Sequence, residues 1–338
     1  MEQRLTALWY RESAGFSLLA PLGWLYAGVM ALRRIAYSVG LFKTLRAGKP
    51  VIVVGNLTVG GTGKTPLVAW LAQQLAATGL RVGIVSRGYG RSGASSERVH
   101  AESSWREVGD EPMLLESLTG CDVIVARDRF QGAQKLVALG VDVIIADDGL
   151  QHWRLARDCE IVVFDGARGF GNGRLLPAGP LREPPSRVHE ADIVVVNGTP
   201  EHPSLRAGLQ GSLQMSLSGG EACRVDGLAA PESLEHFRGR RVHAVAGIGN
   251  PARFFRDLRA RGIEIVEHPF PDHHPFTLAD LTFGDDLPVL MTQKDAVRCR
   301  EIVDARLWYV PVAARFSDSH SRELLERVAQ ALEPARPS

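Results

Sequence analysis

Six short, almost continuously apolar runs recur in the first 200 residues and limit what this chain can fold into. Their ranges are 50–57, 81–88, 122–128, 141–149, 160–166 and 192–198. Strands with both faces covered have this character, because alternation of apolar and polar residues is needed only where one face meets water. Helix-like segments such as 64–78 and 129–139 separate several of the runs. The pattern predicts an α/β fold with a mainly parallel sheet.

The same pattern resumes after a looser region rich in Gly, Ser and Pro, which is typical of a connection. Its later segments are 242–250, 251–262, 263–270, 288–295 and 319–332. The chain is long enough for two domains of about 150 residues each. The predicted parts are an N-terminal helix (1–36), a P-loop core (37–200), a connection (201–235) and a smaller α/β domain that closes the cleft (236–338). The last helix could pack back on the core.

An uncharged stretch of 17 residues, 16–32, precedes this pattern and is followed by Arg33 and Arg34. As a helix it would span about 26 Å, slightly less than the hydrocarbon core of a bilayer. Pro21 further weakens a spanning helix. Nearby Trp and Tyr residues favour the headgroup level, and the flanking bases favour anionic lipid. We expect a helix that associates with one leaflet of a membrane; a buried core helix is the alternative.

A glycine-rich loop lies between the first apolar run and a helix-like segment, and its residues are Thr58, Val59, Gly60, Gly61, Thr62, Gly63, Lys64 and Thr65. Glycines allow backbone N–H groups to turn toward nucleotide phosphates, and the lysine reaches the β- and γ-phosphates. Thr58 replaces the first glycine of the usual G-x-x-x-x-G-K-[ST] pattern. The strand–loop–helix context nevertheless predicts a P-loop that binds ATP, with Lys64 acting on the transferred phosphate.

Two acids end a neighbouring apolar run, Asp147 and Asp148. P-loop enzymes use such an acid, together with the hydroxyl that follows the loop lysine, to hold Mg²⁺. The sequence therefore predicts Thr65, Asp147 and Asp148 as a Mg²⁺ site.

Several further segments have no explanation in a generic P-loop protein. They are SRGYGR (86–91), GDEP (109–112), DDGLQH (147–152), GNGRLLPAGPLRE (171–183) and FPDHH (270–274). Their order and wording, together with the GGTGKTP loop, closely resemble the lipid A 4′-kinases (tetraacyldisaccharide 4′-kinases). The resemblance runs from the apolar N-terminus to at least Asp295.

The resemblance implies a phosphotransferase with an alcohol acceptor. It would transfer the γ-phosphate of ATP to the 4′-hydroxyl of a tetraacylated glucosamine disaccharide 1-phosphate in lipid A biosynthesis. It also implies Mg²⁺ and a peripheral or monotopic location at the cytoplasmic face of a Gram-negative inner membrane. The partners would be the acylated disaccharide and the membrane surface. With a formal net charge of +1, the sequence gives no reason to expect a nucleic-acid partner, and no protein partner is evident.

The resemblance also implies that Asp110 is the catalytic base and that His273 orients or tunes it. An N-cap is the alternative role for Asp110, because Glu111 and Pro112 follow it as a first helical turn. A metal site formed by Asp272, His273 and His274 with His268 is the alternative for the histidine.

Four arginines in the glycine-rich motifs are suited to gripping a phosphate, and Glu183 is placed to orient one of them. They are Arg87, Arg91, Arg174 and Arg182. The segment 292–295 follows a predicted strand and is a guess for recognition of the nucleotide base.

Two other functions use part of the same set. A membrane-bound nucleotide switch needs the loop and the acids, but it leaves Asp110, His273 and the arginines unexplained. A kinase for a soluble small molecule leaves residues 16–32 unexplained.

Overall fold

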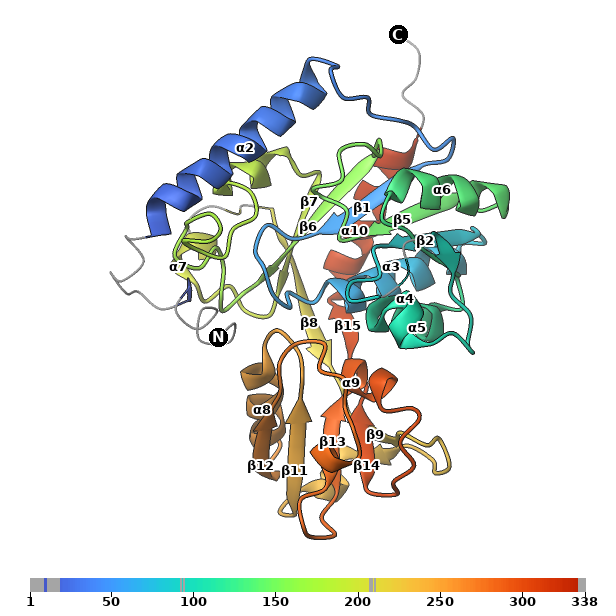
Figure 1. Ribbon diagram of the computed structural model, residues 1–338, viewed down its shortest axis with the longest axis vertical. Coiled ribbons are helices and arrows are strands. Elements are labelled where there is room, and N and C mark those ends of the chain that lie inside the picture. Colours follow the sequence, from blue (N-terminus) through green and yellow to red (C-terminus); the bar gives the residue numbers. More distant parts are fainter. Residues whose placement is uncertain are drawn as a thin grey trace.

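The computed structural model describes residues 9–10, 19–91, 93, 95–206, 209 and 211–333. Among these residues, two sheets organise the chain (Figure 1). We call the nine-stranded sheet, ordered β15-β8-β7-β6-β1-β5-β2-β4-β3, the core sheet. Its strands are β1 (Val51–Gly55), β2 (Val82–Ser86), β3 (Glu97–Arg98), β4 (Asp122–Val125), β5 (Val143–Asp147), β6 (Cys159–Asp165), β7 (Ile193–Asn197), β8 (Leu213–Ser218) and β15 (Ala313–Phe316).

Seven neighbouring strands of the core sheet, from β8 to β4, run parallel, and only the edge strands β15 and β3 pair antiparallel. The carboxyl ends of these parallel strands therefore lie at one edge of the sheet, where α/β proteins build their sites. Val54 of β1 lies opposite Asp147 of β5. This register brings the segment after β1 next to the acids that end β5. The predicted α/β fold with a mainly parallel sheet is confirmed.

Helices cover both faces of the core sheet because the strands are buried on both sides. One face packs against α3 (Lys64–Ala77), α5 (Asp110–Thr119) and α10 (Asp318–Leu332). The opposite face packs against α6 (Arg129–Ala138) and the segments around Leu155 and Phe170. The shorter helices of this part are α4 (Trp105–Val108), α7 (Pro203–Arg206) and the 3₁₀ helix η2 (Pro185–Glu190).

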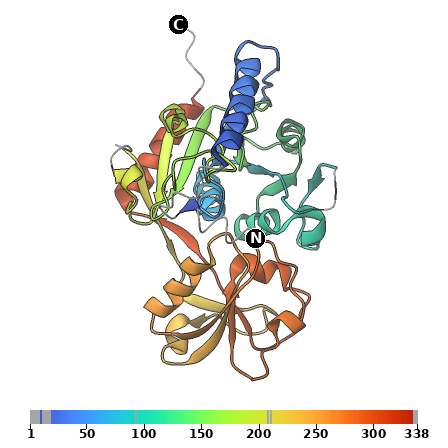
Figure 2. The ribbon, with the colours of Figure 1, turned by 60° about the vertical axis from the view of Figure 1, so that its left-hand side comes forward.

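We call the six-stranded sheet, ordered β10-β9-β14-β13-β11-β12, the smaller sheet. Its strands are β9 (Glu221–Arg224), β10 (Glu232–Ser233), β11 (Arg241–Ala246), β12 (Glu264–Pro269), β13 (Val289–Thr292) and β14 (Leu307–Val310). The helix α8 (Pro251–Ala260) packs on one face, and α9 (Gln293–Arg298) packs on the other. Two 3₁₀ helices, η3 (Leu234–Phe237) and η4 (Ala279–Leu281), complete this part. Figure 2 shows this layered unit beside the core sheet.

The predicted connection over 201–235 is wrong in part, because it contains strands of both sheets. β8 adds to the core sheet, whereas β9 and β10 belong to the smaller sheet. The Ser and Gly content concealed the alternation in β8, where Leu213 and Met215 are buried and Gln214 and Ser216 are exposed. The chain returns to the core sheet through β15 and α10, whose Leu324 joins the core-sheet interior.

An apolar helix lies at the N-terminal end of the described chain. It is α2 (Ala20–Ser38), and residues 16–18 of the predicted stretch lie outside the described residues. Gly23 is its one buried residue; a methyl group there would lie 3.3 Å from the Ala178 side chain. The outer side carries large exposed apolar side chains, which are Leu22, Trp24, Leu25, Val29, Leu32 and Ile35. No helix among the described residues is long and apolar enough to cross a membrane. Figures 1 and 2 show α2 running along the outside of the core-sheet unit.

Candidate active site

The phosphate loop joins β1 to α3, and its geometry follows from its glycines. Gly63 stands just before the helix with φ 95°. A side chain at Gly63 would also meet Asn197, whose amide nitrogen is 2.4 Å from the Cβ position. Asn197 donates a hydrogen bond to Thr62 O at 2.9 Å. Glycine is therefore required here for both backbone conformation and space.

Lys64 begins α3 and points toward the end of β5. Its Nζ donates to Asn56 Oδ1 at 2.9 Å and lies 3.4 Å from Asp148 Oδ1. Asn56 in turn donates to the carbonyl of Thr58 at 2.6 Å, inside the loop. Lys64, the backbone of the phosphate loop and Asp148, which directly follows β5, therefore form one connected group.

The two acids after β5 have different surroundings. Asp147 accepts a hydrogen bond from Ser86 at 3.0 Å through Oδ2, while its buried Oδ1 has no partner among the described residues. Burial raises the pKa of Asp147, and nearby negative charges, led by Glu111, take it to about 7. An uncompensated, buried carboxylate oxygen is suited to a cation.

Asp148 is neutralised by protein cations instead. Arg182 NH1 donates to both of its carboxylate oxygens at 2.9 Å, and Lys64 is close. Burial alone would raise the pKa of Asp148, but Lys64 and Arg182 outweigh burial and hold it well below its ordinary value. Asp148 therefore remains ionised and ties Arg182 to the phosphate loop.

Asp110 and His273 meet across the two sheets. Asp110 begins α5 of the core-sheet unit, and His273 follows β12 of the smaller sheet. His273 Nδ1 lies 2.9 Å from Asp110 Oδ2 and 3.1 Å from Oδ1. Burial alone would raise the pKa of Asp110, but His273 and nearby cations outweigh it and lower the pKa to about 2.

The capping role considered for Asp110 belongs to a different position. Gly109 occupies the N-cap, and Asp110 is the first helical residue, accepting only the N–H of Glu111 at 2.8 Å. Its carboxylate is 3% exposed and is directed to His273. Both carboxylate oxygens lie within hydrogen-bond distance of the imidazole, and Oδ1 also accepts the Glu111 N–H, so Asp110 is not the N-cap of α5.

Two cationic side chains of α9 lie beside the pair of Asp110 and His273, and the sequence analysis did not predict their role. Lys294 Nζ donates to Glu111 Oε1 at 2.9 Å, and Arg298 Nε lies 3.6 Å from Asp110 Oδ2. Asp295 is fully buried and accepts the N–H of Gly247 at 3.1 Å. The guess that 292–295 reads the nucleotide base does not fit these contacts, because Lys294 faces the acid–imidazole pair. The GDEP motif was the signal that could have indicated a cationic partner, since its Glu111 accepts a hydrogen bond from Lys294.

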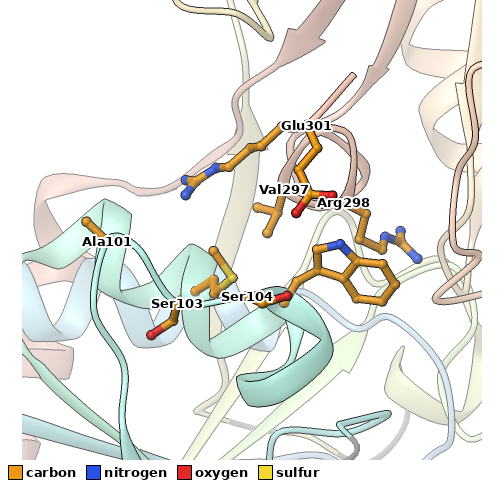
Figure 3. Close-up of a pocket in the computed structure, with 9 residues that line it drawn as sticks. Ala101, Ser103, Ser104, Val297, Arg298 and Glu301 are labelled. Carbon is orange, nitrogen blue, oxygen red and sulfur yellow. The ribbon is translucent and has the colours of Figure 1, made fainter. Parts of the chain in front are cut away.

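A small cavity of about 70 Å³ lies beside the contact between α5 and α9. Figure 3 shows Val297 and Arg298 from α9 on one side of it and Ser103 and Ser104 from the core-sheet unit on the other. Residues of both units line this cavity, which therefore lies at their contact.

The arginines of the glycine-rich motifs do not form a single group. Arg91 is 9% exposed, and none of its three guanidinium nitrogens has a hydrogen-bond partner among the described residues. Burial lowers the pKa of Arg91, and it lowers that of the buried Arg129 to about 10. Arg87 and Arg91 are both close enough to Arg129 to disfavour its charge. Arg129, which sequence reasoning missed, makes this a cluster of three guanidinium groups beside Asp147 and Asp148.

The other two predicted arginines lie elsewhere. Arg174 is exposed, and Arg182 is held by Asp148. Glu183 accepts from Gln151 at 2.6 Å and lies 3.3 Å from Arg187 Nε. The expectation that Glu183 orients one of the four arginines is therefore wrong, because the Glu183 carboxylate is paired with Arg187 instead.

The alternative metal site around His273 is not formed. His268 Nε2 lies 2.9 Å from His243 Nδ1, and His274 packs against Phe270 and Phe276. No group of three His, Cys, Asp or Glu side chains suited to a metal ion occurs within the described ranges.

The smaller sheet also reaches the phosphate loop itself. A methyl group on Gly249, between β11 and α8, would lie 3.0 Å from Gly61 N. Arg168 donates to Gly249 O at 3.4 Å, and Arg253 of α8 donates to Asn197 Oδ1 at 3.0 Å. The phosphate loop therefore lies between the ends of the core strands and the loop that joins β11 to α8 in the smaller-sheet unit.

Comparison with known proteins agrees with this geometry. Residues 16–331 match the model of a family described as tetraacyldisaccharide-1-P 4′-kinase. A tetraacyldisaccharide 4′-kinase from Alkalilimnicola ehrlichii is 52% identical, over 95% of this chain and 96% of that protein. One from Dechloromonas aromatica is 49% identical, over 96% and 94%.

A solved structure of LpxK from Aquifex aeolicus, described as an "apo" form in complex with ATP, also matches. It is 30% identical, with a TM-score of 0.76, over 94% of this chain and 99% of that one. The chain belongs to the tetraacyldisaccharide-1-phosphate 4′-kinase family.

Proposed function

We propose that this protein transfers the γ-phosphate of ATP to the 4′-hydroxyl of a tetraacylated glucosamine disaccharide 1-phosphate, a step of lipid A biosynthesis. The observation that carries the proposal is the meeting of a phosphate loop with a buried acid–imidazole pair. Gly249 links the two, since its Cβ position lies 3.0 Å from Gly61 N and 3.5 Å from Asp272 Oδ2. Asp272 directly precedes His273 in the chain.

The chemistry follows from these positions. The loop N–H groups, the start of α3 and Lys64 hold and neutralise the phosphates of ATP. Asp110 accepts the proton of the 4′-hydroxyl while the hydroxyl oxygen bonds to the γ-phosphorus. The bond between the γ-phosphorus and the oxygen that bridges to the β-phosphate breaks, which releases ADP. His273 orients the Asp110 carboxylate. Because its pKa is about 2, Asp110 is ionised at neutral pH and offers a lone pair to the proton.

Mg²⁺ is the cofactor that the family's reaction requires, and this site fits it. Asp147 offers a buried oxygen that has no partner in the described part of the chain, and Thr65 and Asp148 are the other candidate ligands. When bound, the ion neutralises charge that develops on the phosphate oxygens. Asp147 is a better candidate than Asp148 for direct coordination of Mg²⁺, since Arg182 and Lys64 already neutralise Asp148.

The guanidinium cluster of Arg87, Arg91 and Arg129 supports binding of a phosphate of the lipid substrate or of the transferring group. Arg91 is the buried member without a hydrogen-bond partner among the described residues, whereas Arg87 is exposed and Arg129 donates to backbone carbonyls. A buried guanidinium group without a partner is costly, and phosphate oxygens can satisfy it in a bidentate manner. Arg182 is better assigned to holding Asp148, and the exposed Arg174 to the outer rim of the site.

The membrane surface at the cytoplasmic face of the inner membrane is the proposed location, with α2 as the contact. Leu22, Leu25, Val29 and Leu32 lie at helical spacing on one exposed face. A neighbouring side of the helix contacts the segment that carries Arg182, since the Tyr26 hydroxyl donates to Arg182 O at 3.1 Å. This arrangement would present the site to a lipid whose acyl chains remain in the bilayer.

The smaller-sheet unit is proposed as a domain that covers most of 236–338, while β15 and α10 belong to the core. This domain would complete the site when it closes over the core. His273 and Lys294 both come from this domain. Closure would therefore couple assembly of the catalytic pair to nucleotide binding.

The test is ATP consumption by the purified protein with and without the acylated disaccharide 1-phosphate, with Lys64→Ala as the inactive control. Consumption that depends on the disaccharide, with a phosphate appearing at its 4′ position, supports the proposal. Substrate-independent hydrolysis would instead indicate a nucleotide switch. Activity on a soluble sugar alone would indicate a small-molecule kinase.

A further inference from the structure

Lys294 makes three contacts that together specify the chemistry of its neighbour His273. Its Nζ lies 2.9 Å from Glu111 Oε1, 3.4 Å from Asp272 Oδ1 and 3.4 Å from His273 Nε2. A lysine ammonium has three hydrogens and no lone pair, so all three neighbours must act as acceptors. The three contacts therefore use the full donor capacity of the ammonium.

The remaining charges keep Lys294 in its charged form. Burial alone would lower the pKa of Lys294, but Glu111, Asp110 and Asp272 outweigh burial and raise it. The ammonium therefore does not become an acceptor at any working pH.

The two ring nitrogens of His273 then have different roles. Nε2 lies 3.4 Å from the ammonium, which can only donate, and 3.8 Å from Asp272 Oδ1, too far for a hydrogen bond, so Nε2 must carry the lone pair. Nδ1 lies 2.9 Å from Asp110 Oδ2, and a carboxylate is an acceptor, so Nδ1 must carry the hydrogen. Both contacts require the same neutral tautomer.

We infer that Lys294 is a positioning residue that holds His273 in the neutral Nδ1–H tautomer and so directs its hydrogen bond to Asp110. A ring with its hydrogen on Nε2 would turn a lone pair toward the carboxylate and a donor toward the ammonium. The Asp110 carboxylate would then lose the bond that orients it. The catalytic consequence rests on the proposed role of Asp110 as base.

The groups that face the ring decide whether this assignment is stable. Asp110, Glu111 and Asp272 are negative, Lys294 and Arg298 are positive, and the Tyr89 ring lies 5.1 Å from the imidazole centroid. Among these groups, Lys294 is the donor that faces Nε2 and Asp110 is the acceptor that faces Nδ1. Lys294 is thus the donor that opposes a hydrogen on Nε2.

The first test is ¹⁵N NMR of histidine-labelled protein at neutral pH, with the His273 signals assigned by their loss in His273→Gln. We expect a protonated Nδ1 and an unprotonated Nε2. In Lys294→Met we expect the hydrogen to distribute over both nitrogens. Wild-type protein with the hydrogen on Nε2 would overturn the inference, whether or not any variant folds.

The second test is kinetic and uses the same variant. Lys294→Met should lower kcat about 10- to 100-fold, as loss of an orienting partner does, with KM for ATP nearly unchanged. Lys294→Arg keeps a donor and should recover part of the rate. Lys135→Met, which removes an exposed lysine from α6, is the matched control. Unchanged kcat and an unchanged tautomer in Lys294→Met would contradict the inference.

The two tests separate this inference from the proposed function. If the tautomer is as inferred but Asp110→Asn retains full activity, then the role of Asp110 is wrong and the role of Lys294 toward His273 stands. If Asp110→Asn is inactive and the tautomer differs, the proposed function stands and the role of Lys294 fails.

Discussion

Two site residues have a backbone conformation that side chains usually avoid. Asp148 has φ 48° and His273 has φ 59°, and they are the only non-glycine residues with positive φ in the described part of the chain. Such conformations cost on the order of 1 kcal/mol or more and persist where the surrounding contacts hold them. Asp148 is held by Arg182 and Lys64, and His273 by Asp110. Both residues are thus fixed by the contacts of the proposed chemistry.

Replacement of Asp110 by Asn tests the base. We expect kcat to fall about 100- to 10,000-fold, the usual contribution of a general base, while KM for ATP changes little. Glu107→Gln makes the same chemical change at an exposed position of α4 and should leave both constants unchanged. A variant that melts at lower temperature but keeps its turnover would reduce Asp110 to a structural residue.

The protonation of Asp147 predicts a pH dependence of metal binding. Its pKa is raised to about 7, so below pH 7 the folded protein holds a proton that the metal must displace. Affinity for Mg²⁺ with a nonhydrolysable ATP analogue should therefore rise from pH 6 to pH 8, by up to about tenfold per pH unit below 7.

Calorimetry in buffers of different ionisation enthalpy would count the released proton. Asp147→Asn should remove both the release and the pH dependence, whereas Asp142→Asn, at a more exposed position, should retain them. Binding of constant affinity across this range in the wild type would show that Asp147 is not a ligand.

At the scale of elements, α2 has two sides with different roles. Gly23 and Tyr26 contact the core-sheet unit, and Leu25 and Leu32 are 66% and 68% exposed. Removing the whole helix would disturb both sides at once. Changing only the outer side chains separates membrane contact from support of the site.

Leu25→Ser with Leu32→Ser should release the protein from vesicles that contain anionic lipid. Each leucine contributes about 1.5 kcal/mol or more when buried in an apolar phase, so the pair should lower partitioning on the order of 100-fold. Activity on detergent-solubilised substrate should fall far less than activity on substrate in vesicles.

Leu228→Ser with Val303→Ser, at residues 81% and 85% exposed in the smaller-sheet unit, is the matched control. Equal loss in the detergent and vesicle assays would mean that α2 shapes the substrate site. Unchanged association with vesicles would place the membrane contact elsewhere.

At the scale of the whole molecule, the site exists only where two units meet. The core-sheet unit supplies the phosphate loop, the two acids after β5 and Asp110. The smaller-sheet unit supplies His273, Lys294 and the Gly249 loop that lies against the phosphate loop. We therefore expect the contact between the two units to contribute to nucleotide binding.

Gly249→Val tests this contact. The new side chain would begin 3.0 Å from Gly61 N and 3.3 Å from Gly60 Cα, so the two units must separate or the loop must shift. Overpacking of about 1–3 kcal/mol should raise KM for ATP about tenfold or more. Gly220→Val, where no heavy atom of the described residues lies within 4 Å of the Cβ position, should leave KM near the wild-type value. An unchanged KM in Gly249→Val would mean that the contact plays no part in nucleotide binding.

The sequence by itself determined the elements and the nucleotide end of the site. The strands that end in Gly55 and Asp147, the loop before Lys64 and the helix after it depend on local apolar runs and on glycine conformation, which nearby residues specify. The pairing of Asp110 with His273 was expected from the family resemblance, because no spacing in the chain indicates a contact across 163 residues.

Tertiary structure alone decided the surroundings of that pair. Lys294 and Arg298 were not expected beside it, and β8 was hidden in a segment that looked like a linker. The choice of strand neighbours determines which loops share an edge, and that choice is made by burial summed over both sheets rather than by any local pattern. The contacts that govern the protons of the site therefore appear only once the smaller sheet has packed against the core.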